Sequence, residues 1–118
     1  MKPALKMFRE IMEEGLQKAY DSMGAKRLGG VDEFICIVGK RDSMLGLKVK
    51  FKKGDNKFIY IFNTDPFPGL RGHVSNTALD PCYLDIKRDY FLGPEWNYKL
   101  VRHIWDGAPY TEWHFTKK

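Results

Sequence analysis

The residues with the clearest capacity for chemistry are three lysines spaced two positions apart, Lys48, Lys50 and Lys52. They alternate with apolar residues between Leu45 and Phe51, which is the period of a β-strand that buries one face and exposes the other. On such a strand the three side chains project from the same face at intervals of about 6.6 Å. Successive phosphates of an extended nucleic-acid strand have a similar spacing, so the pattern predicts an electrostatic binding site for a single strand.

The basic residues are concentrated in one segment. The chain of 118 residues has 20 lysines and arginines, 15 acidic residues and a net charge of +5. Residues 40–57 contain seven of the basic and two of the acidic side chains, so the excess lies there and indicates one basic face. Aromatic side chains for base stacking follow at Phe58, Tyr60 and Phe62, although the sequence does not determine whether they share the face of the lysines. Alternatively, the lysines only keep an exposed strand soluble and monomeric.

The segment 64–81 is a second candidate site. It has no periodic pattern and contains several prolines and glycines, and connections of this length are usually either functional or disordered. Phe67 and Leu70 favour an ordered loop, because they can pin it to a core. Arg71 can bind an anion through paired hydrogen bonds, and His73 lies two residues further on. We therefore expect Arg71 and His73 to bind the anionic partner together with the three lysines.

Two histidine tripeptides admit an enzymatic alternative. His73-Val74-Ser75 and His114-Phe115-Thr116 share the pattern H-x-[S/T], which resembles the paired motifs of two-histidine phosphoesterases. The resemblance implies one histidine as general base and the other as general acid. It covers only these tripeptides, and His73 falls in a loop where the family has a strand. No catalytic residue is therefore assigned, and a binding module is favoured over an enzyme.

The sequence predicts neither a metal site nor a cofactor. Cys36 lies within the apolar run 34–38 and Cys82 stands alone, so the cysteines lack the spacing of metal ligands. Both are expected to be reduced, with Cys36 in the core. Residues 85–87 read Asp-Ile-Lys, a D-x-K pattern that is too short to indicate a nuclease.

The size and composition favour one domain spanning residues 1–118. A chain of this length with 43% hydrophobic residues can bury a core of its own. No run approaches the roughly 18 apolar residues of a membrane span, and the N-terminus does not have the layout of a secretion signal. We therefore expect a cytoplasmic protein that does not bind membranes, with its oligomeric state open.

The elements that must position these side chains follow from the periodicity. Residues 3–23 have an apolar stripe at helical spacing, which predicts a long helix. The period then changes to that of strands, and short turns indicate an antiparallel meander with 44–53 as its middle strand. Residues 96–105 also fit a helical face, although their composition favours a strand. The strands are expected at 32–39, 44–53, 57–63, 83–92, 96–105 and 110–116.

These elements predict an α+β fold in which the long N-terminal helix packs across a twisted antiparallel sheet of five or six strands. In that arrangement the apolar face of 45–52 lies beneath Phe8, Met12 and Leu16 of the helix.

The function that the sequence favours is that of a small, basic, non-enzymatic binding module whose partner is an anion, foremost a nucleic acid. One alternative is a small-ligand pocket between helix and sheet, lined by Tyr83, Trp96 and Trp113. Another is a structural or assembly subunit that oligomerises through an exposed aromatic strand.

Overall fold

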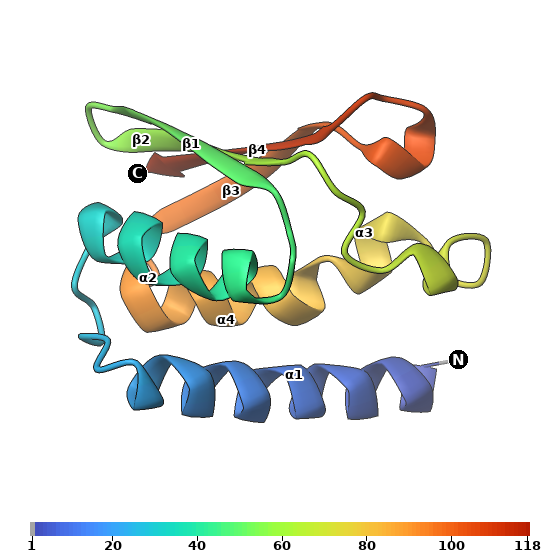
Figure 1. Ribbon diagram of the computed structural model, residues 1–118, viewed down its shortest axis with the longest axis horizontal. Coiled ribbons are helices and arrows are strands. Elements are labelled where there is room, and N and C mark those ends of the chain that lie inside the picture. Colours follow the sequence, from blue (N-terminus) through green and yellow to red (C-terminus); the bar gives the residue numbers. More distant parts are fainter. Residues whose placement is uncertain (1) are drawn as a thin grey trace.

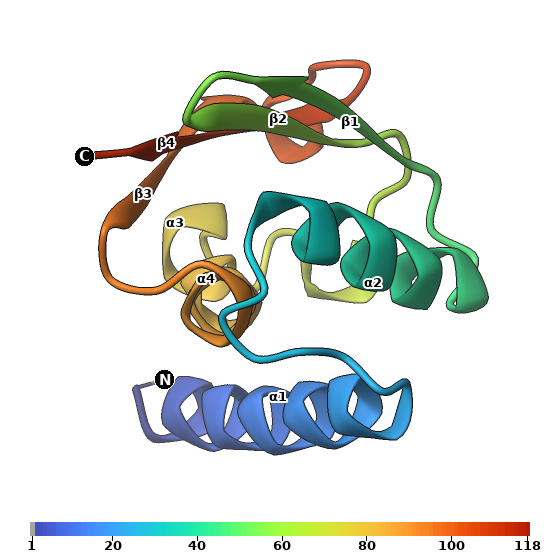
Figure 2. The same ribbon diagram turned by 90° about the vertical axis from the view of Figure 1, so that its left-hand side faces the viewer.

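The computed structural model describes residues 2–118, with side chains from residue 4 onward. Its elements form three layers (Figures 1 and 2): an antiparallel sheet, a middle layer of helices, and the N-terminal helix on the far side. The mixed α+β class is therefore confirmed. In chain order the elements are α1 (Lys2–Ser22), α2 (Val31–Met44), β1 (Val49–Gly54), β2 (Lys57–Phe62), α3 (Asn76–Leu79), α4 (Pro81–Phe91), β3 (Trp96–Arg102) and β4 (Thr111–Lys117).

The long N-terminal helix is present as predicted, but it does not pack on the sheet. Helix α1 lies against α4 and α2 on the side away from the strands (Figure 1). Its buried Tyr20 contacts Tyr90 and Phe91 of α4, with ring centroids 5.3 and 5.0 Å apart. The inner face of the sheet is already covered by α2 and α4, so the predicted packing of α1 across the sheet is wrong.

The sheet has four strands in the order β1-β2-β4-β3, and every neighbouring pair is antiparallel. The prediction of five or six strands is therefore wrong. The predicted strands 96–105 and 110–116 correspond to β3 and β4, which pair with each other from Trp96 and Lys117 onward. Strand β1 was expected in the middle of a meander, but it lies at an edge because the segment before it is a helix.

Two of the predicted strands, 32–39 and 83–92, are the helices α2 and α4. Their isoleucines, valines and aromatic residues favour strands locally. The buried positions nevertheless follow a helical period, as Phe34, Val38 and Asp42 show for α2. Pro81 at the start of α4 suits the first turn of a helix. Tertiary packing of a helical face has therefore overridden the local preference.

The predicted strand 44–53 is shorter than expected. Helix α2 extends to Met44, a turn follows with Gly46 at φ 80°, and pairing begins only at Val49. Leu45 is therefore 57% exposed and not buried as predicted. Phe51 packs against Phe34 of α2, and not beneath α1.

The core is largely aromatic and lies between the sheet and the α2–α4 layer. Phe58, Tyr60 and Phe62 alternate along β2 and are all buried on its inner face. Cys82 is buried, whereas Cys36 is exposed. The prediction that Cys36 belongs to the core is wrong, because in a helix it faces away from its buried neighbours Phe34 and Ile37.

Candidate functional site

The outward face of the sheet carries the predicted lysines. Lys48, Lys50 and Lys52 are all exposed, and the described helices all lie on the other side of the sheet (Figure 2). The strand register places Lys50 opposite Ile61 and Lys52 opposite Ile59. We call this surface the lysine face, and it also includes Lys99, Arg102, Glu112 and His114.

The aromatic residues of β2 do not share the lysine face. Tyr60 pairs with Phe51 of β1 and Phe62 with Val49, so these residues point to the core on the opposite side of the sheet. The centre of the lysine face is aliphatic, with Ile59 and Ile61 partly buried. Stacking of bases on these three aromatic rings is therefore excluded by the register.

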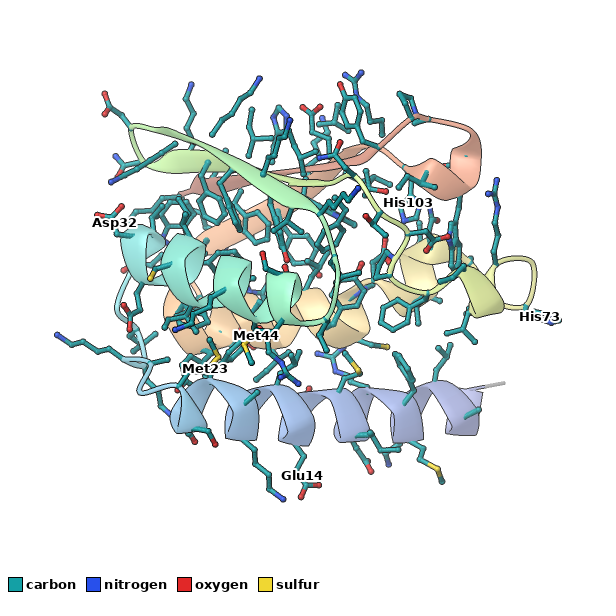
Figure 3. The ribbon with its side chains drawn as sticks, viewed as in Figure 1. Glu14, Met23, Asp32, Met44, His73 and His103 are labelled. Atoms are coloured by element: carbon teal, nitrogen blue, oxygen red, sulfur yellow. The ribbon has the colours of Figure 1, made fainter. Side chains whose placement is uncertain are left out.

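Arg71 and His73 lie away from the lysines. The guanidinium of Arg71 donates to the carbonyl oxygen of Trp105 at 3.1 Å, which ties the loop to the β3–β4 connection. His73 is exposed at the end of the molecule (Figure 3) and lines a cavity of about 180 Å³ with Phe8 of α1. His114 lies on the lysine face. The structure therefore does not bring His73 and His114 together.

The three aromatic residues of the predicted pocket are all buried, but they do not line one cavity. Tyr83 lines a cavity near α1, and Trp113 lines a separate one beside Asp80. Trp96 packs on Phe58 with ring centroids 5.8 Å apart.

A buried polar cluster that the sequence analysis missed lies between the sheet and the helices. Lys87 of α4 and Asp42 of α2 are each 3% exposed, and Tyr60 of β2 is fully buried. The amine of Lys87 donates to the Tyr60 hydroxyl at 2.9 Å and lies 3.5 Å from Oδ1 of Asp42. The hydroxyl of Tyr60 in turn donates to Oδ2 of Asp42. All three groups are therefore linked in one network, which we call the Lys87 cluster.

The helical period explains why these charged residues are buried. Asp42 lies four residues after Val38 on the inner side of α2, and Lys87 lies three residues after Leu84 on the inner side of α4. A charged residue at a position where a helical stripe is otherwise apolar indicates a buried charge, and the sequence contains this signal in both segments. The signal was missed because both segments were interpreted as strands.

Burial changes the acid–base properties of the cluster. Desolvation lowers the pKa of Lys87, and the nearby Asp42 carboxylate opposes this effect without cancelling it. The pKa of Tyr60 is raised well above its ordinary value, first by burial and then by Asp42. The ring centroids of Tyr60, Tyr83 and Phe62 lie 5.1, 5.2 and 5.5 Å from the Lys87 nitrogen, so its charged form has cation–π contacts.

Two adjoining cavities connect this cluster to the surface. The larger, of about 480 Å³, lies between α1 and the end of α2, and we call it the α1–α2 groove. The smaller, of about 50 Å³, is lined by Asp42, Tyr83 and Lys87, and we call it the inner cavity. The walls that both cavities share are formed by Met12, Leu16, Leu45, Leu47, Pro66 and Phe67.

One guanidinium that lines the groove has a buried nitrogen without a hydrogen-bond partner among the described residues. Arg41 lines the α1–α2 groove, and its buried Nε atom has no hydrogen bond. Among the side chains from residue 4 onward, no carboxylate lies within ion-pair distance of Arg41. The hydroxyl of Tyr20 on α1 is also buried and unpartnered. Unpaired buried polar atoms are rare in folded proteins and often indicate a ligand or water.

A second buried network supports the β3–β4 connection. Nε2 of His103 lies 2.9 Å from Asp80, and the Tyr83 hydroxyl donates to the same carboxylate at 3.0 Å. The backbone N–H of Trp105 donates to Nδ1 of His103, so Nε2 carries the proton and donates to Asp80. His103 lies inside the molecule near α3 (Figure 3). These contacts hold the connection in place, and we assign them a structural role.

The comparisons with known proteins do not identify a family. No protein-family model matches the chain, and no curated protein is significantly similar to it in sequence. In the described part of the chain no helix combines the length and apolar character that a membrane span requires. No group of three or more potential metal ligands lies close enough together there to hold an ion.

Proposed function

We propose that this protein binds a small molecule with an apolar body and a carboxylate group in the α1–α2 groove. The observation that carries the proposal is Arg41, whose side chain lines this groove and whose buried Nε has no hydrogen-bond partner among the described residues. A carboxylate accepts two parallel hydrogen bonds from a guanidinium, so it would satisfy the unpaired donor and neutralise the charge.

The shape and lining of the groove support the same ligand class. Small-molecule pockets typically have volumes of about 300–1,000 Å³ and mainly apolar walls with a few polar groups, and the groove measures about 480 Å³. Ile11 and Leu45 line it and are 62% and 57% exposed. A bound hydrocarbon chain would remove this apolar surface from water, which is favourable in proportion to the area buried.

Calorimetric titration with unbranched carboxylates from butanoate to decanoate tests the proposal. Affinity is expected to increase with chain length, and the matching primary alcohols are expected to bind more weakly. Arg41→Gln should weaken carboxylate binding by about tenfold to a hundredfold, the value of a charge-assisted hydrogen bond. Arg102→Gln is the matched control, because Arg102 lies on the sheet and pairs with Glu112 at 3.4 Å. Equal loss in both variants, or no binding by the wild type, contradicts the proposal.

A second candidate function is the binding of a single-stranded nucleic acid on the lysine face. The observation that favours it is that Lys50, Lys52 and Lys99 project from one uncovered side of the sheet. Without exposed aromatic rings from β2, such binding would depend on phosphate contacts and tolerate many sequences. Arg71 and His73 would not contribute, because they lie elsewhere.

Fluorescence anisotropy with several labelled oligonucleotides tests this second candidate. Three phosphate contacts predict that log K falls with log salt at a slope of about −2. The double variant Lys50→Glu, Lys52→Glu should abolish binding. The control variant Lys6→Glu, Lys18→Glu makes the same charge change on α1, in the layer farthest from the lysine face, and it should retain binding. Loss of binding in both double variants would show only a dependence on net charge and would contradict the assignment.

A further inference from the structure

We propose that Lys87 forms an imine with the carbonyl group of an apolar aldehyde or ketone that enters through the α1–α2 groove. The proposal deepens the small-molecule function above and rests on the groove admitting such a ligand. It names Lys87 as the reacting group and carbonyl compounds as the substrate class.

The first argument is access. Lys87 is 3% exposed, yet it lines the inner cavity, which shares six apolar wall residues with the α1–α2 groove. A molecule that fills the groove can therefore place one end beside the amine. The inner cavity of about 50 Å³ has room for a carbonyl group and its adjacent carbon, but not for a bulky headgroup.

The second argument is the orientation of the amine. The Lys87 amine donates one hydrogen to the Tyr60 hydroxyl at 2.9 Å, and the Asp42 carboxylate lies 3.5 Å from the same nitrogen. When the amine is neutral, its lone pair occupies a remaining direction around the nitrogen and is not consumed by these contacts. Fixing the amine in this way lowers the entropic cost of attack on a carbonyl carbon.

The third argument is the charge state. A nucleophilic lysine must be neutral, and a desolvated lysine in an apolar pocket is activated for this reason. Burial lowers the pKa of Lys87, and the contribution of Asp42 only partly offsets this. An ordinary surface lysine is almost entirely protonated at neutral pH, so Lys87 should be the more reactive amine.

The cluster also contains the groups needed to move protons. The nitrogen lone pair of Lys87 attacks the carbonyl carbon, a C–N bond forms, and the carbonyl oxygen takes a proton to give a carbinolamine. The C–O bond then breaks, the oxygen leaves as water after a second protonation, and the nitrogen releases both of its protons. Asp42 can accept and return these protons through the Tyr60 hydroxyl that it binds. The net step converts an amine and a carbonyl into an imine and water, with no oxidation or reduction.

Reductive trapping tests this reaction in the wild-type protein. The folded protein is incubated with hexanal and sodium cyanoborohydride, which reduces an imine to a stable amine, and the alkylated lysines are identified by peptide mass spectrometry. We expect Lys87 to be labelled severalfold faster than the exposed Lys50 and Lys52, which serve as controls in the same digest. The proposal is overturned if the exposed lysines of the folded protein are labelled while Lys87 stays unmodified. Labelling of Lys87 in the urea-unfolded chain would show that the modified Lys87 peptide can be detected.

Two variants separate a reactive site from a merely accessible lysine. Gly15 lines the groove and a Cβ atom there meets nothing within 4 Å, so the side chain of Gly15→Leu should extend into the open space of the groove. This variant should suppress labelling of Lys87 and leave that of Lys50 unchanged. Tyr60→Phe, which keeps the ring and removes the bridging hydroxyl, should slow trapping at Lys87 in a protein shown to be folded by circular dichroism. Unchanged Lys87 labelling in both variants would contradict the proposed route and chemistry.

Hexanoate and hexan-1-ol distinguish failure of this inference from failure of the proposed function. Binding of hexanoate without hexanal labelling at Lys87 would reject the imine and retain the carboxylate site. Labelling at Lys87 without hexanoate binding would reject the carboxylate site and retain the imine. If neither hexanoate nor hexan-1-ol binds and Lys87 is not labelled, both proposals are wrong.

Discussion

Lys87 of α4 and Asp42 of α2 form an ion pair in which each side chain is only 4% exposed. Removing two charges from water has a large unfavourable desolvation energy, so a buried ion pair is weak evidence for stability by itself. It is, however, expensive to break, because the remaining charge is then buried without a partner. The pair therefore restricts how α2 and α4 can pack beneath β2.

The two single substitutions in this pair should together lower the free energy of unfolding by more than the double substitution does. Lys87→Met and Asp42→Asn should each lower the free energy of unfolding by about 3–5 kcal/mol, since each leaves one buried charge unpaired. The double variant should lose less free energy of unfolding than the sum of the two single losses, because no isolated buried charge remains. Urea denaturation of the four proteins measures the coupling.

The exposed pair of Lys18 and Glu14 on α1 is the control for this cycle. Its side chains are 75% and 69% exposed, so water screens the two charges and their coupling energy should be far smaller than that of Lys87 and Asp42. A coupling as small as this between Lys87 and Asp42 would contradict the buried ion pair.

Filling the α1–α2 groove should not reduce stability. Gly15 lies within α1, where glycine is about 1 kcal/mol less favourable than alanine. Gly15→Ala should therefore raise the free energy of unfolding by about 0.5–1 kcal/mol, because the added Cβ meets no atom within 4 Å. Gly15→Leu should keep this gain and block hexanoate, as thermal denaturation and calorimetry would show. Glu10→Leu adds the same side chain to α1 outside the groove and should leave binding unchanged.

The stability of the protein should pass through a maximum at alkaline pH. Burial lowers the pKa of Lys87, so between this lowered pKa and the ordinary value of 10.5 the unfolded chain binds a proton that the folded chain has released, and stability rises with pH over that interval. The pKa values of Tyr20, Tyr60 and Tyr83 are raised by burial, so the stability that they contribute is present below their ordinary value of 10.0 and is lost above it.

Urea denaturation midpoints measured from about pH 7 to about pH 11 check this dependence. In the double variant Asp42→Asn, Lys87→Met, stability should no longer increase with pH, but it should still decrease at the alkaline end, where the buried tyrosines titrate. A rise of the same size in the double variant would show that Lys87 is not its source.

The register of β1 can be tested by comparing neighbouring positions. Phe51 stacks on Tyr60 with ring centroids 4.8 Å apart, so Phe51→Ala should lower the free energy of unfolding by about 2–3 kcal/mol. Lys50 is exposed on the other face, and Lys50→Ala should change it by less than about 0.5 kcal/mol. Similar losses at both positions in denaturant titrations would contradict the register.

The parts of the fold that could be predicted are those whose local period agrees with their composition. Helix α1 has helix-forming residues on an apolar stripe, and β2 and β4 have strand-forming residues that alternate. In α2 and α4 the composition favours strands while the buried positions follow a helical period. A short apolar run is compatible with both structures, so only packing against the sheet selects the helix.

By itself the sequence determined that Lys48, Lys50 and Lys52 are exposed, because a period of two residues next to a core sends alternate side chains to opposite faces. Only the tertiary structure brought Asp42, Tyr60 and Lys87 together, and it also placed Arg41 beside a groove. Local periodicity specifies which side of an element is buried, but not which element covers it. The Lys87 cluster depends on three elements meeting at one point, and that meeting is a property of the packed fold.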